Sequence, residues 1–153
     1  MTGVVTLNIE LELGWGMHDS AEYGHLSSDR SAGTDALHRL LDPADCLDLP
    51  ITFDIVGNLF HDSYSGSHPG PHPESWWTKD PGTNSDTDPL FYAPDLVREI
   101  QNRETNHELA THILSFIGRR SESQELNDEP AKIDELHADI GPTAPMSIVV
   151  PRH

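Results

Sequence analysis

Lysine is the residue type that this sequence most clearly lacks. Only two of the 153 residues are lysines, Lys79 and Lys132, and Lys and Arg together number nine against 26 Asp and Glu. The formal charge of −17 excludes binding to nucleic-acid phosphates, because too few cations are present to release counterions. It also argues against an anionic membrane surface. Charge of one sign repels itself unless salt screens it, so we expect a high-salt cytoplasm; an acidic surface in an ordinary cell is the alternative.

Cysteine and apolar residues are also scarce. Cys46 is the only cysteine, which excludes an intrachain disulfide, and its apolar neighbours predict a small side chain in the core. The N-terminal stretch has no basic region and is interrupted by Glu10 and Glu12. It is therefore neither a signal peptide nor a membrane span, and we expect a cytoplasmic protein. The apolar fraction of 35% leaves little to bury, which suggests that a partner or further chain contributes to the core.

Short apolar runs alternate with helical patterns along the chain. Strands are predicted over residues 4–13, 51–56, 108–112 and 146–150. Helices are predicted over residues 34–49, 93–103 and 128–140. This order predicts an α/β fold with a parallel sheet, specifically a partial (β/α) barrel of about four βα units in one domain, residues 1–153.

Three local features refine these assignments. In the first helix, Thr34 is predicted as the N-cap, and Pro43 is predicted to break the helix, with Asp42 capping a second short piece. Residues 61–92 show no periodicity and form a long loop after the second strand. A loop in that position emerges on the face where barrels and parallel sheets bind ligands.

Ten histidines and many carboxylates make a divalent metal site worth considering. Glu10 and Glu12 near the end of the first predicted strand, and His112 at the end of the third, would point to the same mouth of a barrel. Spacing alone favours a plainer interpretation, in which the two glutamates line an exposed edge strand and His112 is hydrogen-bonded at a strand end.

Four segments together resemble motifs of the polysaccharide deacetylase (NodB-homology) family. They are residues 8–13 (NIELEL), 49–57 (LPITFDIVG), 106–116 (NHELATHILSF) and 147–152 (SIVVPR). The resemblance implies a distorted (β/α) barrel and a metal-dependent hydrolase that removes N-acetyl groups from carbohydrate, with zinc or a similar ion activating water.

The resemblance also implies residue roles. Glu10 would be the general base, Glu12 the metal carboxylate, His112 the first metal histidine, and Arg152 would orient the base. Glu10 is one methylene longer than the family's aspartate, and Phe116 stands where the family has its second metal histidine. We also expect the domain to be incomplete at its C-terminal end, without the family's later motifs. These departures predict that the isolated chain does not turn over substrate.

The long loop offers further candidates. His61 is an additional metal ligand or a solvated side chain, with the two readings equally supported, whereas His68 and His72 are better read as solvated. Trp76 and Trp77 could stack on sugar rings. The alternative function is a non-catalytic module, either a sugar-binding remnant or a fragment completed by a second chain or by another copy of itself.

The charge imbalance predicts a strong dependence of stability on salt. Screening shortens the range of repulsion to about 8 Å at physiological ionic strength and further in molar salt. The melting temperature should therefore rise steeply from low to molar KCl, measured by circular dichroism. A flat or falling trend would contradict the high-salt interpretation.

Overall fold

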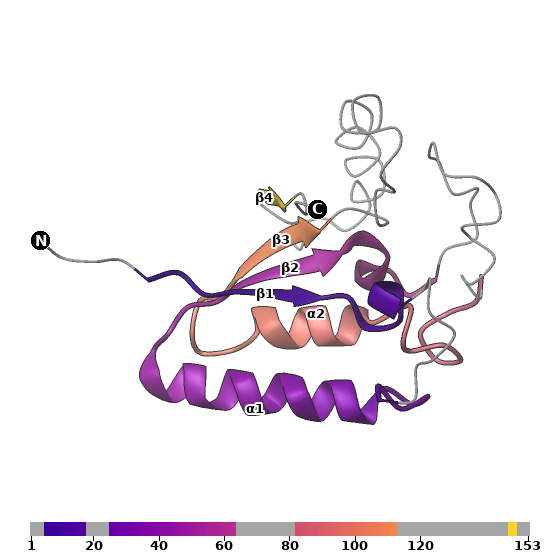
Figure 1. Ribbon diagram of the computed structural model, residues 1–153, viewed down its shortest axis with the longest axis horizontal. Helices are drawn as coiled ribbons and strands as arrows, with labels where there is room; N and C mark the ends of the chain where they lie inside the picture. The colour runs from indigo at the N-terminus through magenta and orange to yellow at the C-terminus, as the bar shows by residue number, and fades with distance from the viewer. Residues whose placement is uncertain (1–4, 18–24, 64–81, 113–146, 150–153) are drawn as a thin grey trace, which may run out of the picture.

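A parallel β-sheet forms the centre of the protein. The computed structural model describes residues 5–17, 25–63, 82–112 and 147–149 (Figure 1). The strands are β1 (Asn8–Leu11), β2 (Thr52–Val56), β3 (Glu108–His112) and β4 (Ser147–Val149). They lie in the order β1-β2-β3-β4, and every neighbouring pair is parallel. The described elements form an α/β sheet, and they do not close into a barrel.

Two α-helices connect the strands and lie on the same face of the sheet (Figure 1). Helix α1 (Ser31–Leu47) links β1 to β2, and α2 (Pro94–Gln101) links β2 to β3. Two short 3-10 helices, η1 (Leu13–Met17) and η2 (Gly57–Phe60), directly follow β1 and β2. No helix of the described residues is long and apolar enough to cross a membrane.

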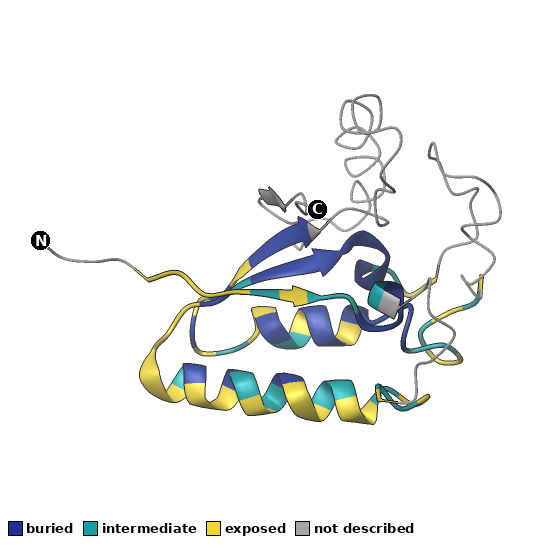
Figure 2. Ribbon diagram, in the orientation of Figure 1, coloured by how far each residue is buried: buried dark blue, intermediate teal, exposed yellow. Residues whose placement is uncertain are grey.

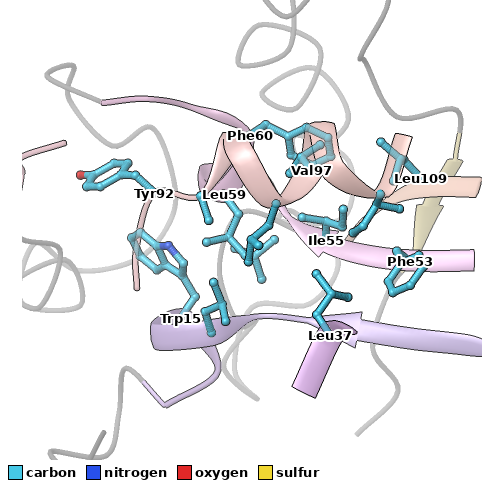
Figure 3. Close-up of a cluster of buried hydrophobic side chains, with 14 of the residues drawn as sticks. Trp15, Leu37, Phe53, Ile55, Leu59, Phe60, Tyr92, Val97 and Leu109 are labelled. Atoms are coloured by element: carbon cyan, nitrogen blue, oxygen red, sulfur yellow. The ribbon is translucent and has the colours of Figure 1, made fainter. Parts of the chain in front are cut away.

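The hydrophobic core lies between the sheet and these helices (Figure 3). Phe53 and Ile55 of β2 are completely buried, and so is Leu41 of α1. Helix α2 contributes Leu96, Val97 and Ile100, the stripe that its sequence predicted. Figure 2 shows the opposite side of α1 exposed, as expected for a helix that covers only one face of a sheet.

Helix α1 begins earlier than predicted. Its N-cap is Arg30, with φ 64°, and not Thr34. The first turn is satisfied from upstream, because Ser31 N–H donates to Asp29 Oδ1 (3.1 Å) and Ala32 N–H donates to Ser27 Oγ (3.0 Å). These side chains supply the acceptors that a capping residue normally provides.

The predicted break at Pro43 is wrong, because α1 continues through it to Leu47. Proline has no backbone N–H, so Pro43 leaves the carbonyl of Arg39 without its helical hydrogen bond. Both residues are exposed, so water can bond that carbonyl. Packing holds the helix together on the other side, where Leu37, Leu41 and Ala44 are buried at helical spacing. Cys46 lies off this stripe and is exposed, so its predicted place in the core is also wrong.

The first strand is shorter than predicted. The prediction spans residues 4–13, whereas β1 covers Asn8–Leu11, and Val5 is 92% exposed. The predicted alternation does hold within β1, since Ile9 and Leu11 pack against the core and Glu10 is exposed. The predicted helix over residues 128–140 lies outside the described residues.

Two arginines fasten α1 to α2. Both guanidinium nitrogens of Arg30 bond the carboxylate of Asp95, at 2.9 and 2.5 Å. Burial raises the pKa of Asp95, but the hydrogen bonds and charge of Arg30 lower it by more, so the net pKa lies below the usual value. At the other end of α2, Arg103 bonds Asp42 at 3.1 Å and Glu99 at 3.3 Å. The scarce cations thus lie where the two acidic helices meet.

Removing buried volume from α1 should destabilise the protein far more than removing the same atoms from its surface. Leu41 is 0% exposed and Leu47, in the same helix, is 73% exposed. Leu41→Ala should lower the free energy of unfolding by about 2–5 kcal/mol, and Leu47→Ala by less than about 0.5 kcal/mol. Urea titration in molar salt measures both. Equal losses in the two variants would contradict the packing of α1 against the sheet.

Candidate functional site

The carboxyl ends of the strands bring the sequence-predicted acidic residues and histidine to one edge of the sheet. Leu11 pairs with Ile55, and Val56 pairs with His112, so Glu12 follows β1 at the level where β2 and β3 end. The arrowheads of β1, β2 and β3 point the same way (Figure 1). In parallel α/β proteins this edge is where ligands bind.

Two carboxylates lie opposite each other on β1 and β2. Glu10 pairs with Asp54, and neighbouring strands are about 4.8 Å apart. Paired residues point to the same face, and the core-packed neighbours Ile9 and Phe53 place that face away from the helices. Glu10 is exposed, whereas Asp54 is only 3% exposed. The polar face of the sheet therefore carries one accessible and one buried carboxylate.

A turn containing two glycines follows Glu12 and shapes the end of β1. A Cβ on Gly16 would overlap the carboxylate of Glu12, so glycine is required for Glu12 to fold back over the turn. A Cβ on Gly14 would meet the Leu90 carbonyl at 3.0 Å, the same carbonyl that accepts the Gly14 N–H at 2.9 Å. Between them and Glu12, Leu13 has φ 48°, an unfavourable region for leucine. This strained turn fixes where Glu12 lies.

Trp15 anchors the turn to a distant part of the chain. Its indole N–H donates to the Phe91 carbonyl at 2.9 Å, and the two rings meet edge to face with centroids 5.4 Å apart. Trp15 is 4% exposed and Tyr92 is completely buried beside this segment (Figure 3). The end of the predicted 61–92 loop is therefore part of the core, and it supports the end of β1.

The remaining predicted site residues fall into two groups. His112 lies on β3 and is placed by its backbone, and His61 follows η2, where its N–H donates to the Asn58 carbonyl at 3.2 Å. The others lie outside the described residues: His68, His72, Trp76, Trp77, Phe116 and Arg152. In the described part of the chain, no three His, Cys, Asp or Glu side chains gather in an arrangement that could hold a metal ion.

Asp54 and the glycine turn were not predicted as site features. Asp54 lies within segment 49–57, one of the four that resemble the family motifs. A carboxylate inside an otherwise apolar strand is the feature that could have identified it. The turn's signal was the Gly-Trp-Gly sequence immediately after an acidic strand end.

Comparisons with protein-family models, with curated proteins and with solved structures found no match.

The incomplete ligand set predicts weak zinc binding. Glu12 and His112 are two candidate ligands, whereas structural zinc sites use four and catalytic sites three. Calorimetric titration should give a dissociation constant weaker than about 1 μM, and Glu12→Ala or His112→Ala should weaken it further. Tight binding would mean that other histidines complete the site. Binding unchanged in both variants would exclude the predicted ligands.

Proposed function

We propose that this chain is a polysaccharide deacetylase-family protein, descended from an enzyme that removed N-acetyl groups from carbohydrate, and that the chain alone no longer catalyses this reaction. One observation carries the proposal: Glu10 and Glu12 at the end of β1 share the carboxyl edge of one parallel sheet with His112 at the end of β3. These are the positions at which the resemblance implies a base and two metal ligands.

The winding of the sheet supports a relationship to a (β/α) barrel. Each strand lies beside the one before it, and α1 and α2 lie on the same face (Figure 1). A doubly wound sheet would instead reverse its strand order at a switch point and carry helices on both faces. In a barrel that continued this winding, the helices would lie outside and Glu10 and Asp54 would face the interior.

The donor atoms support loss of activity. Phe116 offers no donor in the sequence position where the family has its second metal histidine. A bound divalent ion would polarise an amide carbonyl and acidify water. Glu10 remains accessible to accept a proton, one methylene further from its backbone than aspartate would be.

A specific observation favours a second candidate, a module completed by another chain. Among the described strands β1 has only β2 as a neighbour, so its other edge is open to pairing with a second copy or a different chain. Val5 and Leu7, just before that strand, are exposed. Trp76 and Trp77 remain candidates for sugar stacking in this case.

The proposed loss of catalysis is tested by acetate release. The purified chain, with zinc or cobalt added, should release no acetate from chitooligosaccharides above a metal-only control, because base, ligands and acid act as a unit. Glu10→Gln should be indistinguishable from the unaltered protein. Metal-dependent release that Glu10→Gln abolishes would overturn the proposal and show that the site is rebuilt. Chitooligosaccharide binding without release, measured by calorimetry, would favour the sugar-binding module.

A further inference from the structure

A buried histidine begins the hydrogen-bond ladder between β2 and β3. The Ile51 carbonyl accepts the Glu108 N–H at 2.9 Å. In a regular parallel ladder the Ile51 N–H would then donate to the carbonyl of Asn106. It donates instead to Nδ1 of His107, at 3.2 Å. The imidazole thus replaces a backbone carbonyl in the first rung.

The surroundings of His107 specify one form of the ring. Its side chain is 0% exposed, and Phe53 contacts it edge to face with centroids 5.6 Å apart. Nδ1 can accept the Ile51 N–H only while it carries no proton, so in the neutral ring the proton resides on Nε2. Nε2 faces Asp45 Oδ1 of α1 at 3.6 Å.

The carboxylate of Asp45 also contacts groups other than His107. Arg103, which follows α2, bonds Asp45 Oδ2 at 3.4 Å, and the Thr105 N–H bonds Oδ1 at 3.3 Å. Burial raises the pKa of Asp45, but hydrogen bonds from Thr105 and the charge of Arg103 lower it by more, so the pKa of this carboxyl lies below its usual range. Among the described residues, the charged groups next to the ring are Asp45 of α1 and, through Asp45, Arg103, which follows α2.

We propose that His107 is a proton-sensitive latch that joins the C-terminal end of α1 to the start of β2 and β3. A proton added to Nδ1 would set two N–H donors, those of the ring and of Ile51, against each other, and the first rung would be lost. The latch closes when the ring is neutral and opens in acid. The latch is independent of the proposed function, although β3 runs from this rung to His112.

The sign of the pH effect follows from proton counting. Both ring nitrogens of His107 can carry protons in the unfolded chain, whereas the closed latch requires Nδ1 to carry none. Acid should therefore favour the unfolded chain, and one extra proton there lowers the folding equilibrium constant by at most about tenfold per pH unit. Asp45 loses its negative charge only at a lower pH than the one at which the latch opens, because its pKa lies below the usual aspartate value.

The variant His107→Asn separates the latch from simple packing. The Oδ1 of asparagine can occupy the position of Nδ1 and accept the Ile51 N–H, but it cannot be protonated. The folding equilibrium constants of both proteins are measured by urea titration at pH 7 and at pH 5. The constant of the unaltered protein should fall more than that of the variant, and the difference between the two falls should be at most about tenfold per pH unit. Contributions from other histidines, such as His38 beside Glu99 at 2.8 Å, are common to both proteins and cancel.

A measurement on the unaltered protein keeps the proposal testable if the variant fails to fold. Long-range proton–nitrogen NMR spectra should show His107 protonated on Nε2 alone at pH 7. Exchange of the Ile51 amide hydrogen, relative to that of Thr52, should accelerate in acid. A proton on Nδ1 at pH 7, or equal pH dependence in the protein and the folded variant, would overturn the proposal.

Discussion

Strand β2 is hydrogen-bonded to β1 on one side and to β3 on the other, and this pairing positions the residues of the candidate site. Its register with β1 places Glu10 beside Asp54, and its register with β3 places His112 beside Val56. A shift of one residue in either ladder would turn every side chain of the shifted strand to the other face. Such a shift would expose Ile9 and Leu11 or Leu109, which pack in or against the core. The apolar face therefore enforces the register, and the polar face inherits its arrangement.

The charge of the chain acts against this small core. A net charge of −17 favours expansion of the chain. Two arginines counter it locally: Arg30 at the start of α1 pairs with Asp95 of α2, and Arg103 after α2 pairs with Asp42 of α1. Exposed ion pairs of this kind are each worth at most about 1 kcal/mol, so they orient the helices more than they stabilise them.

The sequence predicted the features that depend on periodicity. The buried stripe of α2 and the positions of β2 and β3 follow from apolar spacing, which packing then reinforces. Features that depend on tertiary partners were missed or misread. The chain passes through Pro43 because a buried stripe on the opposite side holds α1, and α1 starts at Ser31 because Ser27 and Asp29 reach its first amides. Asp54 could not be assigned to a site without the register, because its pairing with Glu10 is what brings the two carboxylates together on the polar face.

Ancestry and activity respond to different constraints in this fold. The register is held by backbone hydrogen bonds and by apolar residues such as Phe53 and Leu109, and none of these is a candidate ligand. Catalysis, in contrast, requires side-chain atoms to be held within about 0.5 Å, and one missing donor is enough to prevent it. Under the proposed relationship, Phe116 stands in the place of a metal-binding histidine, and such a change takes away a donor without removing any rung of the described ladders. The hydrogen bonds and apolar contacts that hold the β-sheet are therefore independent of the side chains that a catalytic site would need.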